Sequence, residues 1–125
     1  MAHPGMPHRQ ARDVGDRGED AAAAHLRARG VRILERNWRC AHGELDIVGL
    51  DGDDVVFYEV KTRRSGRFGH PAEAVTPAKA ARLRRLAGLW LSAHPHLGQD
   101  LRIDVLALRL RGAGSYQVDH LRGVA

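Results

Sequence analysis

The chain has 125 residues, of which 43% are hydrophobic and 28% are charged, so it has the size of one ordinary domain with a single core. It contains no run of about 18 apolar residues, which excludes a membrane-spanning helix. The first residues contain no apolar signal segment, and Cys40 is the only cysteine, so an intrachain disulfide is excluded. We therefore expect a reduced, cytoplasmic protein with no membrane partner.

The charge balance favours an acidic partner. Lys and Arg number 20 against 15 for Asp and Glu, which gives a net charge of +5. Nearly all of these cations are arginine, whose planar guanidinium donates paired hydrogen bonds to phosphate oxygens. A GC-rich genome would also raise arginine together with alanine and glycine, so composition alone does not establish a nucleic-acid partner.

The N-terminal region is predicted to be a tail followed by a helix. Residues 1–14 contain two prolines and no apolar period, which predicts a flexible basic tail and leaves residues 15–125 as a single domain. Asp16 is a suitable N-cap, and Gly30 is suited to end the helix. Glu19 shares a stripe with Ala23 and Leu26, so its carboxylate is expected to face the domain body. The alternative is that Glu19 only completes a capping box with Asp16.

The remaining elements form a mixed pattern of strands and one further helix. Thr76 and Pro77 are an N-cap and first residue for the second helix, and Pro95 ends it. Strands are predicted at residues 31–34, 44–48, 55–61, 101–110 and 116–121, the last as an extra edge strand. The order is α-β-β-β-α-β, an α/β fold with a mixed sheet flanked by helices.

Two strands of this sheet carry a candidate catalytic cluster. A loop at residues 51–54 would pair Leu50 with Val55 in an antiparallel hairpin. In that register Asp46 lies opposite Glu59, and Glu44 lies opposite Lys61. Opposed residues have Cβ atoms about 4.5–5.5 Å apart, so two carboxylates and an ammonium would meet on one face.

Such a cluster suits the hydrolysis of phosphodiesters by a divalent cation. Carboxylate oxygens hold Mg²⁺ or Mn²⁺, which polarises a phosphoryl group and lowers the pKa of an attacking water. Asp46 and Glu59 suit the role of ligands, and Glu19 could supply a further one from the first helix. Lys61 suits orienting or deprotonating the water, or countering charge on the phosphorus.

Each of these residues also has a purely structural interpretation. Glu59 and Lys61 would belong to a solvated strand face, with a cross-strand ion pair to Glu44. A Glu-x-Lys motif alone recurs by chance. Asp46 is harder to explain in this way, because aspartate is disfavoured within a hydrophobic strand.

At these residues the chain resembles a known family. The resemblance runs from about Gly15 to Leu121, and its main segments are Gly18-Glu19, Arg36-Asn37-Trp38-Arg39, Gly43-Glu44-Leu45-Asp46-Ile47-Val48, Glu59-Val60-Lys61-Thr62-Arg63 and Phe68-Gly69-His70-Pro71-Ala72-Glu73-Ala74-Val75. The family is that of the YraN-like proteins, of the restriction-endonuclease-like PD-(D/E)xK superfamily, similar in plan to archaeal Holliday-junction resolvases.

The resemblance implies the restriction-endonuclease-like fold and a nuclease site. By position it makes Asp46, Glu59 and Lys61 the metal-and-water site and Glu19 the acid of the first helix. Leu45 stands where the superfamily motif has proline. Because resolvase-like enzymes need two active sites, the resemblance also implies a homodimer if branched DNA is the substrate.

Basic residues beside this cluster are candidates for binding nucleic acid. Arg63, Arg64 and Arg67 follow the active-site strand in a glycine-rich loop, which can follow a phosphate backbone. On the second helix Lys79, Arg82 and Arg85 recur at a spacing of three and give it a basic side, for which an ordinary solvated face is the alternative. Few aromatic residues are available for stacking single strands, so duplex or branched DNA fits better.

Three functions remain open from the sequence. The first is a Mg²⁺- or Mn²⁺-dependent endonuclease acting on DNA, with branched or recombination intermediates as candidate substrates. The second is a non-catalytic nucleic-acid-binding module of nuclease fold that assists a helicase or recombination partner. The third is a protein-interaction domain whose charged patches meet an acidic partner. The sequence does not distinguish DNA from RNA.

Overall fold

The computed structural model describes residues 6–63, 75–97 and 100–124, with side chains described from residue 17 onward. Two helices and five strands follow one another along the chain: α1 (Met6–Ala28), β1 (Arg32–Cys40), β2 (Gly43–Asp51), β3 (Asp54–Arg63), α2 (Pro77–Ser92), β4 (Leu101–Leu110) and β5 (Tyr116–Leu121). A short 3-10 turn at Gly112–Gly114 separates the last two strands. The predicted order α-β-β-β-α-β is confirmed, together with the extra edge strand.

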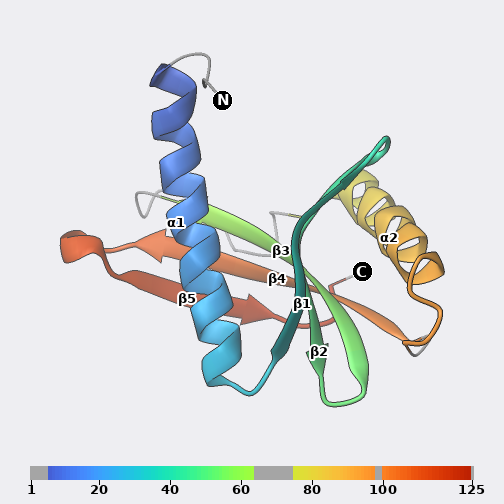
Figure 1. Ribbon diagram of the computed structural model, residues 1–125. Helices are drawn as coiled ribbons and strands as arrows, with labels where there is room; N and C mark the ends of the chain where they lie inside the picture. The colour runs from blue at the N-terminus through green and yellow to red at the C-terminus, as the bar shows by residue number, and fades with distance from the viewer. Residues whose placement is uncertain (1–5, 64–74, 98–99, 125) are drawn as a thin grey trace.

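The strands form one mixed sheet in the order β1-β2-β3-β4-β5. The pairing of β3 with β4 is parallel and the other pairings are antiparallel. A parallel pair needs a long crossover, and here the segment containing α2 provides it. Helix α1 lies across one face of the sheet and α2 packs at the other (Figure 1). No helix in the described part of the chain is both long and apolar enough to cross a membrane.

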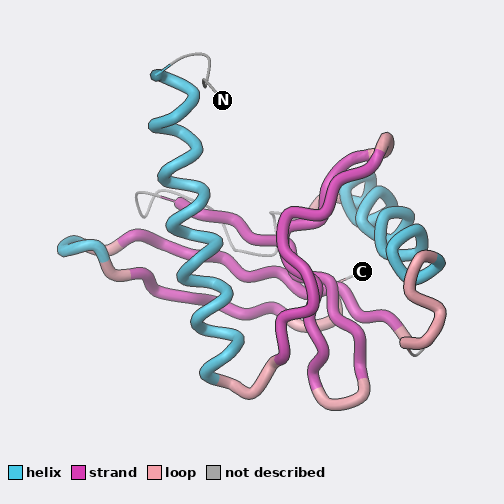
Figure 2. The backbone as a smooth tube through the Cα atoms, in the orientation of Figure 1, coloured by secondary structure: helices cyan, strands magenta, loops and turns pink. Residues whose placement is uncertain are grey.

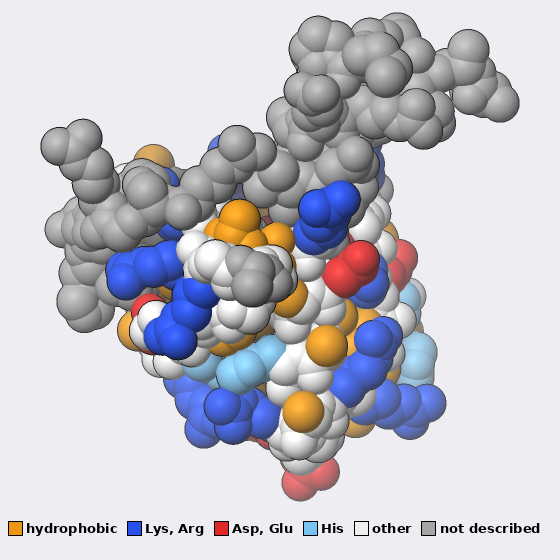
Figure 3. All heavy atoms as spheres, turned by 90° about the vertical axis from the view of Figure 1, so that its left-hand side faces the viewer, with side chains coloured by type: hydrophobic (Ala, Val, Ile, Leu, Met, Phe, Trp, Pro, Cys, Tyr) orange, Lys and Arg blue, Asp and Glu red, His pale blue; other side chains and the backbone are white. Residues whose placement is uncertain are grey.

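Two clusters of buried side chains fill the two layers. On the α1 side, Ala22, Ala23 and Leu26 pack against Ile47 and Tyr58, as the predicted helix stripe requires. The α2 side is built from Leu83, Leu86, Ala87 and Trp90 of the helix and Val48, Val55, Phe57 and Ile103 of the sheet. The face shown in Figure 3 carries several groups of Lys and Arg side chains, in keeping with the net positive charge.

The start of α1 was predicted wrongly. The helix begins at Met6 rather than Asp16, so most of the predicted tail is helical. Pro7 is the second residue of the helix, where the first N–H groups have no partner within the helix and a missing one costs nothing. Glu19 therefore lies well inside the helix, and the capping-box interpretation is excluded.

Helix α1 packs closely against β3 at Gly18. A Cβ built on Gly18 would overlap the Thr62 Oγ1 and lie 3.1 Å from the Thr62 Cβ. We expect Gly18→Ala to lower the free energy of unfolding by about 1–3 kcal/mol, measured by urea titration, because the helix must move away from the sheet.

Gly88 of α2 is the matched control, because nothing lies within 4 Å of a Cβ built there. Gly88→Ala is expected to stabilise the protein by up to about 1 kcal/mol, as alanine does in a helix. Adding Thr62→Ala to Gly18→Ala should recover part of the loss. If Gly18→Ala were as stable as Gly88→Ala, the close approach would not limit packing.

Arg102 of β4 holds the turn between β2 and β3. Its guanidinium donates to Asp51 Oδ2 at 2.9 Å and to the fully buried Asp104 at 3.0 Å, and it lies 3.5 Å from Asp54. His120 and the Gly123 N–H complete the partners of the Asp104 carboxylate. This network fixes the turn that sets the register of β2 and β3.

Candidate active site

The candidate site lies where β2 leaves β3. The hairpin register is the predicted one, since Leu50 pairs with Val55 and Ile47 with Tyr58. The ladder ends at this pair, and two residues farther along β3 the Val60 N–H donates to the Asp46 Oδ2 at 2.9 Å. The Asp46 side chain therefore fills the gap at the point where the strands part, next to Glu59.

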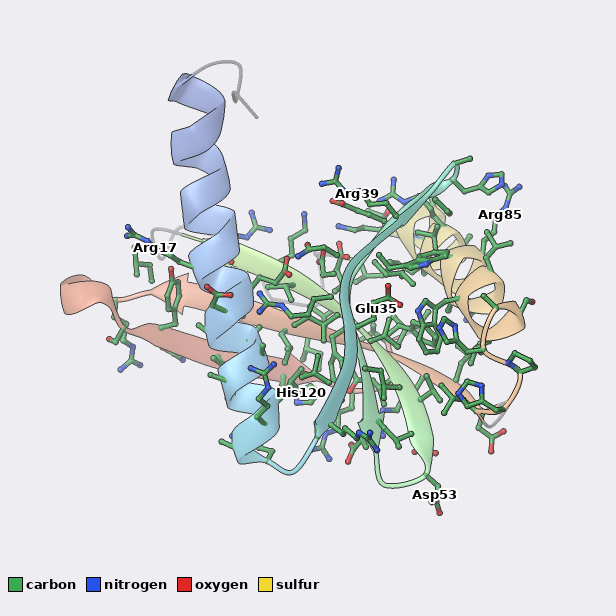
Figure 4. All side chains as sticks on the ribbon, viewed as in Figure 1. Arg17, Glu35, Arg39, Asp53, Arg85 and His120 are labelled. Carbon is green, nitrogen blue, oxygen red and sulfur yellow. The ribbon has the colours of Figure 1, made fainter. Side chains whose placement is uncertain are left out.

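Beyond Asp46 the hairpin of β1 and β2 bends away from β3 toward α2 (Figure 2). Residues two apart share a face on a regular strand, yet Ile47 packs in the α1 cluster and Leu45 packs in the α2 cluster. Glu35 of β1 points toward α2 and accepts a hydrogen bond from the Trp90 indole at 2.8 Å (Figure 4). These contacts hold the hairpin against α2 and open a fork at Asp46.

The prediction that Glu44 lies opposite Lys61 is wrong. The β2–β3 ladder ends before either residue, and Glu44 pairs with Arg39 of β1 at 3.0 Å instead. Glu44 still borders the site. It lines a polar cavity of about 270 Å³ in the fork, together with His42, Gly43, Asp46, Glu59 and Arg82.

Asp46 is an unusual carboxylate for a strand residue. Burial, followed by the negative charge of Glu59, raises the pKa of Asp46 to about 7. The hydrogen bond from the Val60 N–H lowers the pKa again in part, and the charge of Glu19 raises it further. Near neutral pH Asp46 is therefore only partly ionised, and a cation placed beside it would favour the ionised carboxylate.

Glu59 already has a cation beside it. The Lys79 Nζ lies 2.5 Å from the Glu59 Oε2, and the two side chains are only 16% and 12% exposed. Lys79 stands in the first turn of α2, where its backbone N–H donates to the Thr76 Oγ1 at 3.1 Å. The solvated face considered as the alternative for helix two does not apply to Lys79, whose ammonium belongs to the site.

Lys61 lies beside Lys79. The nearby Lys79 ammonium, burial and the charge of Arg63 lower the pKa of Lys61, while the negative charge of Glu59 opposes them. Lys61 can therefore release a proton more easily than an ordinary lysine. The structure thus brings Lys61 near Glu59, and it adds a second lysine, Lys79, that the sequence pattern did not place there.

Glu19 reaches toward the fork from the α1 face. The residue is only 9% exposed, which confirms that its side chain points into the domain. Arg36 lies 3.4 Å from the Glu19 carboxylate and 2.7 Å from Asp20. Across the described residues, no three His, Cys, Asp or Glu side chains come together as a group able to hold a metal ion. Asp46 and Glu59 are thus an adjacent pair, and Glu19 acts on Asp46 through its charge.

The five basic residues predicted to bind nucleic acid have different positions. Lys79 and Arg82 border the fork, and Arg63 is half-buried at the end of β3. Arg64 and Arg67 lie outside the described residues. His42 and Gly43, at the turn between β1 and β2, line the cavity but were missed as site residues. The signal that could have found them is the glycine at this turn, since Gly43 has a φ of +139°.

Comparison with known proteins gives a consistent family. Residues 18–108 match the model of "Uncharacterised protein family UPF0102". A UPF0102 protein of Beutenbergia cavernae is 54% identical over 111 residues, covering 89% of this chain and 94% of the relative. A UPF0102 protein of Arthrobacter sp. has the same identity and coverage. One from Mycolicibacterium vanbaalenii is 50% identical over 113 residues, covering 90% and 93%.

Proposed function

The chain belongs to uncharacterised protein family UPF0102, and we propose that it is a divalent-metal-dependent endonuclease of the restriction-endonuclease-like superfamily that hydrolyses phosphodiester bonds in DNA. The observation that carries the proposal is the half-buried Asp46 carboxylate, whose pKa is raised to about 7, beside Glu59 at a fork that opens to solvent as a polar cavity. A carboxyl group whose pKa is raised by desolvation and by a neighbouring carboxylate in a cleft is typical of a functional site.

The donor set of this site fits a hard divalent cation. Mg²⁺ is usually held by one or two carboxylates together with waters and phosphate oxygens, so Asp46 and Glu59 suffice as protein ligands. When bound, the cation would polarise a phosphoryl group and lower the pKa of an attacking water. Glu19, whose charge already acts on Asp46, would add negative potential from the α1 side.

The chain's own residues supply the rest of the chemistry. Lys61, with its lowered pKa, is suited to take a proton from the attacking water. Arg82 at the cavity wall is suited to hold a substrate phosphate, because guanidinium binds phosphate oxygens in a paired geometry. His42, which also lines the cavity, adds a further polar side chain from the β1–β2 turn.

Cleavage assays test the proposal directly. We expect the protein to cleave linear duplex or four-way-junction DNA with Mg²⁺ or Mn²⁺, and Asp46→Ala and Lys61→Ala to lower the rate by about 100-fold or more each. Arg84→Gln, on the exposed side of α2, should cleave like the wild type and serves as the control. Cleavage that survives both substitutions would remove this site as the catalytic one.

The ion pair between Lys79 and Glu59 favours a second candidate function. A site whose carboxylate is already neutralised by a lysine can bind nucleic acid without cutting it. Under this alternative the protein is a non-catalytic module that assists a helicase or recombination partner. Salt-sensitive DNA binding with no cleavage of any substrate by the wild-type protein would support it, with a salt slope that reports the number of phosphates contacted.

A further inference from the structure

We propose that Lys79 is the resident counter-ion of Glu59, that it competes with the divalent cation for this carboxylate, and that it moves to a substrate phosphate when the cation binds. The inference rests on the proposed metal site and adds a regulatory role for a residue of α2. It is based on the position of the Lys79 ammonium, which contacts the Glu59 carboxylate that a bound metal ion would need.

The contact itself makes Lys79 a competitor. Its Nζ lies 2.5 Å from the Glu59 Oε2, with both side chains largely buried, so the ion pair is screened less than one on the surface. A cation held by the pair needs the same carboxylate oxygens. Two positive groups at one carboxylate repel each other, so each weakens the binding of the other.

The groups around Lys79 favour movement of the displaced ammonium toward an anion in the cavity. Lys61 lies beside Lys79, and Arg82 lies at the wall of the cavity that Glu59 lines. Once a cation holds Glu59, the Lys79 ammonium loses its ion-pair partner and stands among other positive groups. Thr76 caps α2 and fixes the backbone of Lys79, so the displaced side chain stays close to the fork. A phosphate oxygen entering the cavity is such a partner.

Metal binding without DNA tests the competition. Isothermal titration of the full chain with Mn²⁺ at pH 8 should show that Lys79→Met binds roughly tenfold more tightly than the wild type, since removing one nearby charge is worth about that much. Methionine keeps the length of the buried stem. Lys79→Arg keeps the charge and should bind Mn²⁺ about as the wild type does.

Arg84→Gln is the charge-matched control. Arg84 is exposed on α2 and stands about 140° around the helix from Lys79, so its loss should change Mn²⁺ affinity less than about twofold. If the wild type binds Mn²⁺ but Lys79→Met binds it no more tightly, the competition is absent and this inference is wrong. If no variant binds Mn²⁺, the metal site itself is wrong and the inference falls with it.

DNA binding tests the movement of the ammonium. The anisotropy of a labelled 20-base-pair duplex should show equal affinities for Lys79→Met and Arg84→Gln in EDTA, because Glu59 then holds Lys79. In Mn²⁺, Lys79→Met should bind the duplex about five- to tenfold more weakly than Arg84→Gln, as the loss of one phosphate contact predicts. An equal loss with and without Mn²⁺ would make Lys79 an ordinary phosphate contact and contradict the proposal.

Discussion

Asp46→Asn is expected to stabilise the protein at pH 8 while removing metal-dependent cleavage. The pKa of Asp46 is raised from 3.8 to about 7, so the folded protein holds a proton that the unfolded chain releases. The ionisation of Asp46 therefore affects stability least near pH 4. As the pH rises toward 7, the free energy of unfolding falls by about 2–4 kcal/mol in total. An asparagine amide avoids this cost, because it carries no charge, accepts from the Val60 N–H and can donate to Glu59.

Urea unfolding at several pH values measures this effect. The difference between Asp46→Asn and the wild type should be near zero at pH 4, grow through pH 5–7 and level off above pH 7. Asp53→Asn is the control, since Asp53 points into solvent at the β2–β3 turn (Figure 4) and its loss removes the same charge. A variant that is less stable than the wild type at pH 8 would show that the carboxylate supports the fold rather than serving the site.

Stabilisation by Mn²⁺ is expected to depend on pH in the same range. A ligand at about 100 times its dissociation constant stabilises a protein by about 2.7 kcal/mol, which for a chain of this size raises the melting temperature by about 10 °C. The cation needs the ionised form of Asp46, so at pH 5.5 its affinity should be roughly 30-fold lower than above pH 7.

Thermal melts with and without Mn²⁺ at constant ionic strength test this dependence. The shift should be large at pH 8 for the wild type and Asp53→Asn, small at pH 5.5, and absent at both pH values for Asp46→Asn. An equal shift at pH 5.5 and pH 8 would place the bound cation elsewhere.

Most of the fold was predictable because local chemistry and packing agree. Thr76 and Pro77 mark the start of α2 correctly, and the strands at Leu101–Leu110 and Tyr116–Leu121 have the predicted ends. The hairpin register was also correct, although the turn is tighter than predicted, since Asp51 and Asp54 are themselves paired. A four-residue loop and a two-residue turn give the same register here, so the prediction of Asp46 beside Glu59 did not depend on that detail.

The errors arose where tertiary contacts override strand alternation. Glu44 and Lys61 follow the alternating pattern in sequence, but β2 leaves β3 at Asp46 because β1 and α2 offer it other partners. The ion pair of Lys79 with Glu59 joins residues twenty positions apart through a crossover, and no local pattern in the sequence reports it. The proline at position 7 suggests a tail, yet proline is also common in the first turn of a helix. Only the residues that follow it decide between the two, and here they continue the helix.

The first strand also limits how two copies of this chain can associate. Among the described strands, β1 is at the edge of the sheet and pairs with β2 alone. Its register against β2 shifts between Ile33 and Glu35, and Asn37 has a positive φ of 55°, so the edge is bent rather than straight. Bent edges with charged side chains such as Arg32 and Arg39 resist joining to another sheet. A dimer that cuts two strands of a junction would therefore have to assemble through the helices or the β5 edge, and the distance between its two cuts would be set there.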